Sequence, residues 1–171
     1  MSFGNLSTLE VSKCGRLMNL MTISTAESLV NLERMNVTDC KMIQQIIQQV
    51  GEVEKDCIVF SQLKYLGLHC LSSLKSFCMG NKALEFPCLE QVIVEECPKM
   101  KIFSQGVLHT PKLRRLQLTE EDDEGRWEGN LNSTIQKLFV EMVCADLTKF
   151  LMQFPCICTV LFHFLFFIFL E

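Results

Sequence analysis

The sequence predicts a solenoid of the α/β type, built from short parallel strands stacked side by side. Three observations predict it. An apolar frame recurs five times along the 171 residues, its two central positions are two residues apart as in a β-strand, and a small residue, often Cys, follows them at a fixed distance. One such strand cannot bury its own apolar side, whereas stacked copies share a continuous core.

The fourth copy shows the frame most clearly, with Phe86, Leu89, Val92, Val94 and Cys97 in order. The marker leucine recurs at intervals of 26, 31, 26 and 24 residues, at Leu6, Leu32, Leu63, Leu89 and Leu113. Most of these intervals fit the roughly 20 to 29 residues of leucine-rich repeats. We therefore expect a leucine-rich-repeat horseshoe, with a short parallel β-sheet on the concave face and irregular or short helical outer segments.

The cysteines fit the frame as small groups that tolerate burial. The Cys position is filled by Cys14, Cys40 and Cys97. Zinc sites usually take two ligands from one short loop, and the only close pair, Cys156 and Cys158, lies in an apolar tail without a partner pair. A metal or redox protein is therefore the least favoured alternative, and we expect neither metal nor cofactor.

Charge and composition narrow the function. With 20 acidic and 16 basic residues and no clustered basic stretch, the chain is not expected to bind nucleic acid. The longest charge run, Glu120–Glu124, is expected to be a solvated loop. The first residues lack the features of a signal peptide, which favours a reducing, cytoplasmic compartment and silent sequons at Asn5, Asn36 and Asn132.

Three regions are expected: leucine-rich repeats over 1–126, a carboxy-terminal capping segment over 127–153, and an apolar tail over 154–171. Helical spacing of apolar residues favours one amphipathic helix in the capping segment over a degenerate sixth strand at Ile135, Leu138 and Val140. The uncharged stretch 154–170 is at the lower limit for spanning a bilayer. A membrane anchor and a tail translated from non-coding or frame-shifted sequence are both open interpretations.

Three stretches resemble one family: LEQVIVEECPKMKIF (89–103), PKLRRLQL (111–118) and WEGNLNSTIQKLF (127–139). They look like the carboxy-terminal repeats of plant intracellular disease-resistance receptors of the coiled-coil, nucleotide-binding type, over about residues 1–139. The resemblance implies a sensor in plant defence whose partner is a pathogen effector, a guarded host protein, or the nucleotide-binding domain of a full-length receptor. The sequence lacks a G-x-x-x-x-G-K-[ST] loop, and it opens inside a repeat frame, so we expect a fragment, a truncated gene product or a partial gene model.

The polar side of the strands is the predicted protein-binding surface. If the copies stack in register, it presents three columns: Thr8, Arg34, Tyr65, Gln91, Arg115; Glu10, Asn36, Gly67, Ile93, Gln117; and Ser12, Thr38, His69, Glu95, Thr119. Its two arginines and two glutamates cancel, which suits protein recognition. The candidate contact residues on this concave face are Arg34, Tyr65, His69, Gln91, Ile93, Glu95, Arg115 and Gln117, with Arg34, Tyr65, Ile93 and Arg115 foremost because Tyr and Arg are enriched at interface hot spots.

Catalysis has no support in the sequence. None of the three histidines lies in a known catalytic frame, and Asp122 and Asp123 are adjacent in a charged run. A non-catalytic interaction module is therefore favoured, and the alternative is a membrane-tethered repeat protein. If the paired aliphatic residues point into the core, Val94→Asp should unfold the module, because an unpaired buried charge is costly. Glu95→Ala, on the outward side, should leave the fold nearly unchanged.

Overall fold

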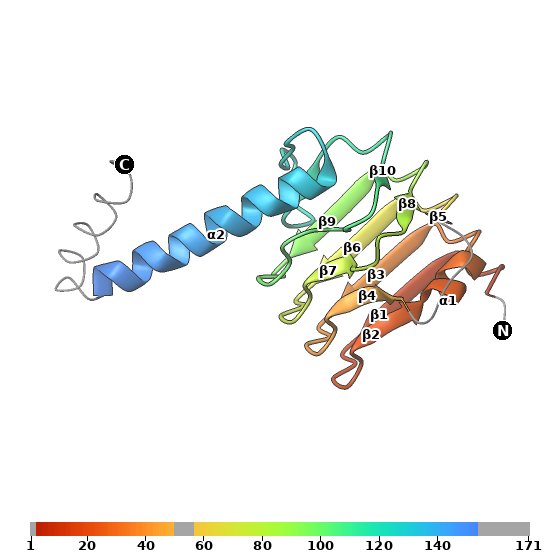
Figure 1. Cartoon of the computed structure of the whole chain (residues 1–171), viewed down its shortest axis with the longest axis horizontal. Coiled ribbons are helices and arrows are strands. Elements are labelled where there is room, and N and C mark those ends of the chain that lie inside the picture. Colours follow the sequence, from red (N-terminus) through yellow and green to blue (C-terminus); the bar gives the residue numbers. More distant parts are fainter. Residues whose placement is uncertain (1–2, 50–56, 154–171) are drawn as a thin grey trace. The chain divides into compact units, whose positions relative to one another are not determined.

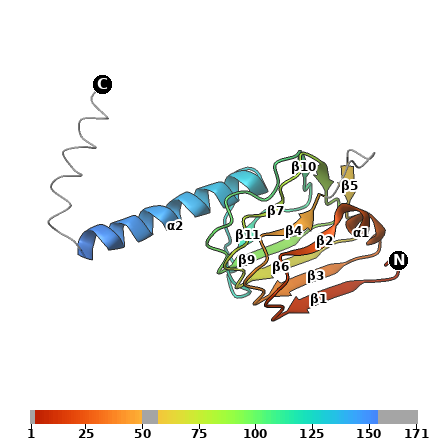
Figure 2. The same cartoon turned by 60° about the horizontal axis from the view of Figure 1, so that its bottom comes forward.

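The computed structural model describes residues 3–153 except 50–56, and it describes the side chains as far as residue 150. Its first compact unit, up to Lys137, is built around one five-stranded parallel sheet. The strands are β1 (Thr8–Ser12), β3 (Arg34–Thr38), β6 (Tyr65–His69), β9 (Gln91–Glu95) and β11 (Leu116–Gln117), which lie in that order across the sheet. Figure 1 shows β1, β3, β6 and β9 side by side, and Figure 2 shows β11 next to β9. This confirms the predicted solenoid of stacked parallel strands.

The return path of the chain is more regular than expected. It carries two further parallel sheets of three strands each, one in the order β2-β4-β7 and the other in the order β10-β8-β5 (Figure 1). Their bounds are β2 (Asn19–Thr22), β4 (Gln45–Gln48), β7 (Ser76–Cys78), β5 (Cys57–Val59), β8 (Ala83–Glu85) and β10 (Leu108–His109). A short helix, α1 (Ile23–Ser28), follows β2 and is capped by Thr22, whose side chain accepts a hydrogen bond from the Thr25 amide.

The main sheet has the predicted register. Two apolar rows face the core, one made of Leu9, Met35, Leu66, Val92 and Leu116 and the other of Val11, Val37, Leu68 and Val94. Val37 and Leu68 are fully buried, but Val94 is only half-buried. Because β11 ends at Gln117, no strand residue pairs with Val94 on that side. Val94→Asp is therefore a poor test of the register, and Leu68 is the better position.

Four phenylalanines fill the interior between the sheets of the third and fourth turns. Phe60 stacks on Phe86 with ring centroids 5.1 Å apart, and Phe77 stacks on Phe103 at 4.7 Å. Edge-to-face contacts join the two stacks, and all four rings are fully buried. Each stack joins equivalent frame positions of successive copies, so the repeat itself brings these rings together.

The residue that follows each of the first four strands of the main sheet has a left-handed backbone conformation. Lys13, Asp39, Cys70 and Glu96 have φ between 50° and 55°. The residue of the Cys position follows at once. Cys40 is fully buried there, and the Cys97 thiol donates to the carbonyl oxygens of Glu95 and Leu68. Cys14 is exposed, so its predicted burial is wrong, because β1 is the edge strand of the sheet and only one neighbouring copy covers it. Burial raises the pKa of Cys97 to about 12, so its thiol stays protonated at neutral pH.

Two sets of hydrogen bonds satisfy backbone groups near the last turn of the solenoid. Leu116 exchanges two backbone hydrogen bonds with Arg126, at 2.8 and 2.7 Å. The Asn132 side chain accepts from the amides of Phe103 and Ser104, at 3.0 and 3.1 Å, and donates to the Ser104 carbonyl at 2.9 Å. Asn132 therefore holds a structural position.

Residues predicted as a capping segment contain helix α2 (Leu131–Gln153), rather than a sixth strand. The first compact unit ends at Lys137, within this helix, and the second begins at Leu138. Its side chains are mostly exposed as far as Phe150, so a capping role stays a prediction. None of the described helices is both long and apolar enough to cross a bilayer. The tail 154–171 lies outside the described residues.

Candidate recognition face

The side of the main sheet opposite the core rows, here called the front face, carries the three predicted columns. Strand pairing aligns Thr8, Arg34, Tyr65 and Gln91; then Glu10, Asn36, Gly67, Ile93 and Gln117; then Ser12, Thr38, His69 and Glu95. Two predicted members, Arg115 and Thr119, lie just outside β11, because that strand has only two residues. The predicted register therefore holds in all five copies, although strand pairing in the fifth covers only Leu116 and Gln117.

Exposure on the front face differs from the prediction. Four candidate residues are buried: Ile93 at 0 % exposed, Gln117 at 4 %, and Tyr65 and His69 at 8 % each. Arg34, Gln91 and Glu95 are half-buried, and Arg115 is exposed. The prediction that all eight side chains face solvent is wrong, because their long side chains contact one another across neighbouring strands and a loop lies against them.

Neighbouring strands are joined on the front face by polar and stacking contacts. The Arg34 guanidinium lies over the Tyr65 ring, with Cζ 3.6 Å from the ring centroid. Gln91 donates from Nε2 to Gln117 Oε1 at 2.8 Å. Burial raises the pKa of the Tyr65 phenol, although the Arg34 charge acts in the opposite direction. These contacts orient the side chains before any partner arrives.

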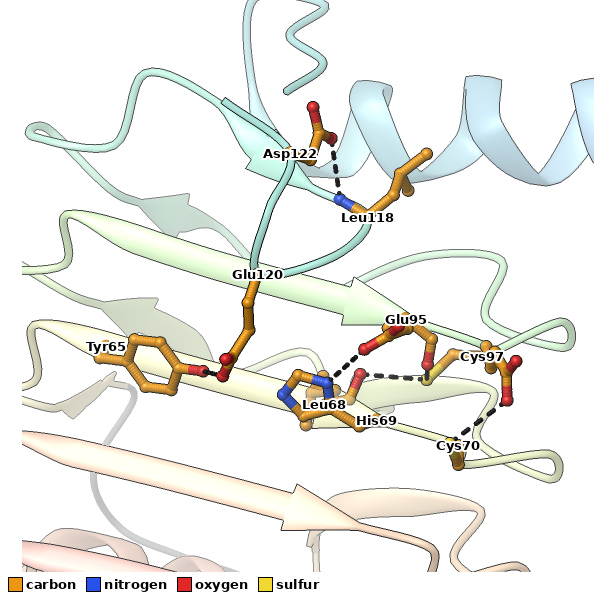
Figure 3. Close-up of polar contacts among 10 residues, drawn as sticks. Tyr65, Leu68, His69, Cys70, Glu95, Cys97, Leu118, Glu120 and Asp122 are labelled. Atoms are coloured by element: carbon orange, nitrogen blue, oxygen red, sulfur yellow. Dashed lines mark hydrogen bonds and ion pairs between the residues drawn. The ribbon is translucent and has the colours of Figure 1, made fainter. Parts of the chain in front are cut away.

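Gly67 leaves a gap in the middle column, and three polar groups converge on it. A Cβ at this position would lie 2.5 Å from Asn36 Oδ1, 2.6 Å from His69 Nε2 and 3.0 Å from Tyr65 Oη. His69 Nδ1 lies 2.9 Å from Glu95 Oε2 (Figure 3). Asn36 Oδ1 and His69 Nε2 are buried without a hydrogen-bond partner among the described residues. A buried unpaired polar atom costs about 1 to 3 kcal/mol, so this cluster is stabilised by any group that pairs with it.

The acidic run lies in a loop, here called the cover loop (Thr119–Arg126), and four of its five residues are exposed, as predicted from their charge. The loop is nevertheless held in place by hydrogen bonds. The Asp122 carboxylate accepts from the amides of Gly125 at 2.9 Å and Leu118 at 3.1 Å. These backbone donors lower the pKa of Asp122. Gly125 has φ +62°, which suits the turn. The signal was an Asp three residues before a Gly, and charge counting overlooked it.

The cover loop also reaches the front face. Gln117 donates from Nε2 to the Asp122 carbonyl at 2.8 Å. Tyr65 Oη donates to Glu120 Oε1 at 3.3 Å, as Figure 3 shows. Glu120 was not among the predicted site residues. The arrangement offers hydrogen bonding and apolar contact to a partner. Among the described residues, no group of three or more His, Cys, Asp or Glu side chains is placed to hold a metal ion.

Comparisons with known proteins agree with this architecture. The family model of plant disease resistance protein RPS2-like leucine-rich repeats matches residues 1–122. Two relatives from Arabidopsis thaliana are disease resistance protein SUMM2, 34 % identical over 57 % of this chain, and probable disease resistance protein At1g12290, 35 % identical over 74 %. The chain covers only 10 % and 14 % of their respective lengths. No solved structure gives a significant match. This chain belongs to the RPS2-like leucine-rich-repeat family of plant disease resistance proteins.

Proposed function

We propose that the chain is a non-catalytic protein-recognition module that senses a pathogen effector or a guarded host protein in plant defence. The observation that carries the proposal is the front face. Its side chains come from every strand of the main sheet, in register, and include an Arg stacked on a Tyr. Interface hot spots are enriched in these two residue types.

The charge of the front face supports a protein partner over a polyanion. Arg34 and Arg115 are balanced by Glu10 and Glu95, and Glu120 adds a further carboxylate at Tyr65. Phosphate-binding surfaces need a concentration of positive charge, which this face does not have. The proposed compartment is the cytoplasm.

A nucleotide-binding domain of a full-length receptor is a second partner of the same kind. The relatives are several times longer than this chain. If these repeats act within a protein of similar length, they would contact the other domains of that same protein. Such a contact would also use a surface of the repeats, and it can be distinguished from effector recognition by the identity of the protein bound.

Site-specific photo-crosslinking in plant cells tests the proposal. A crosslinking amino acid is placed at Arg34 or Thr38 on the front face, and at the exposed Lys75, next to β7 in another sheet, as the matched control. We expect defined protein adducts from the two front-face positions and none above background from position 75. Equal adducts from all three positions, or none from the front face, would contradict recognition there.

A further inference from the structure

We propose that the cover loop is a removable cover over the carboxy-terminal half of the front face, which a partner must lift to reach β6 and β9. The proposal rests on the proposed function, because it assumes that the front face is the recognition surface. It changes what the free chain presents. In the closed state β1 and β3 are open to a partner, whereas Tyr65 and Ile93 are not.

Strand order shows what the loop crosses. Glu120 follows β11, at the edge of the sheet, and its carboxylate meets Tyr65 on β6, while β9 lies between those two strands. The path therefore passes over β9, as Figure 3 shows. Ile93, in the centre of β9 on this side, is fully buried although it lies beside the side-chain gap of Gly67. An Ile exposed at this point would be an apolar contact for a partner.

The two ends of the cover loop are held unequally. At its carboxyl end, Arg126 exchanges two backbone hydrogen bonds with Leu116. Its middle is held through side chains, because Asp122 accepts from the amides of Leu118 and Gly125 and Arg115 donates to the Asp123 carbonyl. At the tip, among the described contacts, Glu120 reaches β6 through one hydrogen bond of 3.3 Å. A hollow of about 410 Å³ is lined by loop residues that include Thr119, Asp122 and Gly125. The tip can therefore lift while the Arg126 end stays attached.

The cover loop leaves two buried polar atoms of the front face without a hydrogen-bond partner among the described residues. Asn36 Oδ1 and His69 Nε2 lie next to the covered Tyr65 and have no partner among the described residues. The Glu120 carboxylate has no proton to donate to them, whereas a partner with an amide, hydroxyl or ammonium group does. A permanent structural cap gains stability by pairing such atoms, so their unpaired state favours an exchangeable cover.

The chain contains a single tyrosine, so Tyr65 reports directly on the cover. The test compares nitration of Tyr65 by tetranitromethane in the parent chain, Glu120→Ala and Asp122→Ala, with the exposed neighbour Glu121→Ala as the control. Losing one hydrogen bond should raise the open population, and hence the nitration rate, about fivefold in Glu120→Ala. Asp122→Ala should raise it at least as much, and Glu121→Ala should match the parent.

Thermal unfolding, followed by circular dichroism on the same four proteins, completes the test. The proposal expects Glu120→Ala to keep a cooperative transition close to that of the parent. Unchanged nitration in both variants, or faster nitration only with loss of the folded core, would overturn it. These measurements need no partner. Failure of front-face crosslinking would contradict the proposed function but not the removable cover. Nitration of Tyr65 that does not respond to the variants would contradict the removable cover but not the recognition face.

Discussion

β3 and β6 are neighbours with the same repeat frame, yet their outer rows differ. Along β3 the residues alternate between half-buried and buried, as expected for a strand with one face toward a core. All five residues of β6 are buried. Both strands place aliphatic side chains inward, at Val37 and Leu68. The difference lies entirely on the front face, where Tyr65 and His69 on β6 contact other parts of the chain and Thr38 on β3 is more exposed.

The comparison teaches that the two rows of a strand are set by different physics. The inward row follows from the period of the sequence, because every copy needs an aliphatic pair there to share the core. The outward row depends on the residues that happen to adjoin it, including a loop from 55 positions further along the chain. Changes to the two rows should therefore have separable effects.

The largest effect is expected from a charge placed in the inward row. Leu68→Asp puts an unpaired carboxylate at a fully buried position, and it should destabilise the fold by about 4 kcal/mol or more, enough to unfold a marginal domain. Thr38→Asp, on the outward row of β3, is the matched control and should cost about 1 kcal/mol or less. Urea unfolding measures both. Similar midpoints for the two variants would show that the rows are not distinct.

The next effect concerns the gap at Gly67. Gly67→Ala forces the side chains of Asn36 and His69 apart and should destabilise the fold by about 1 to 3 kcal/mol. Asn36→Ala removes one of the crowding atoms, so the double variant should recover part of that loss. A double-mutant cycle by urea unfolding measures the coupling. Additive losses would mean that the two residues do not meet over Gly67.

Asn132→Ala should cost about 1 to 2 kcal/mol, because it leaves the amides of Phe103 and Ser104 without their acceptor. The nearby Ser133 is the control: its side chain is half-buried, and Ser133→Ala should shift the unfolding midpoint only slightly. Thermal denaturation compares them. If the two variants melt together, the Asn132 contacts contribute little.

The smallest effect is a loss of stability at high pH. The Cys97 pKa is about 12 in the folded state against 9.0 for an unperturbed thiol, so above pH 9 the unfolded chain releases a proton that the folded chain keeps. Stability should therefore fall between about pH 9 and 12, by about 1.4 kcal/mol at pH 10 from this group. Cys97→Ala should flatten that slope in urea unfolding at pH 8 and 10. If the free energy of unfolding depends on pH in the same way in Cys97→Ala, burial of Cys97 is not the cause of that dependence.

Much of the fold could be predicted because one physical requirement repeats. The five marker leucines and the paired aliphatic positions gave the strands, their parallel order and their register. The exposure of Tyr65, His69, Ile93 and Gln117 was predicted wrongly, since no periodic signal says which surfaces meet far along the chain. Glu120 was missed for the same reason. The return-path sheets were missed because their strands are only two to four residues long, too short to show a period.

Native-state hydrogen exchange tests the central claim most directly, which is that the covered half of the front face opens while the core stays folded. We predict that the Gly125 amide, bound to Asp122, and the Leu118 amide exchange through an opening that costs much less free energy than exchange of the β6 amides. Asp122→Ala should speed exchange of the loop amides alone. Loop and β6 amides that exchange with the same free energy would contradict the account, because the cover would then open only when the whole domain unfolds.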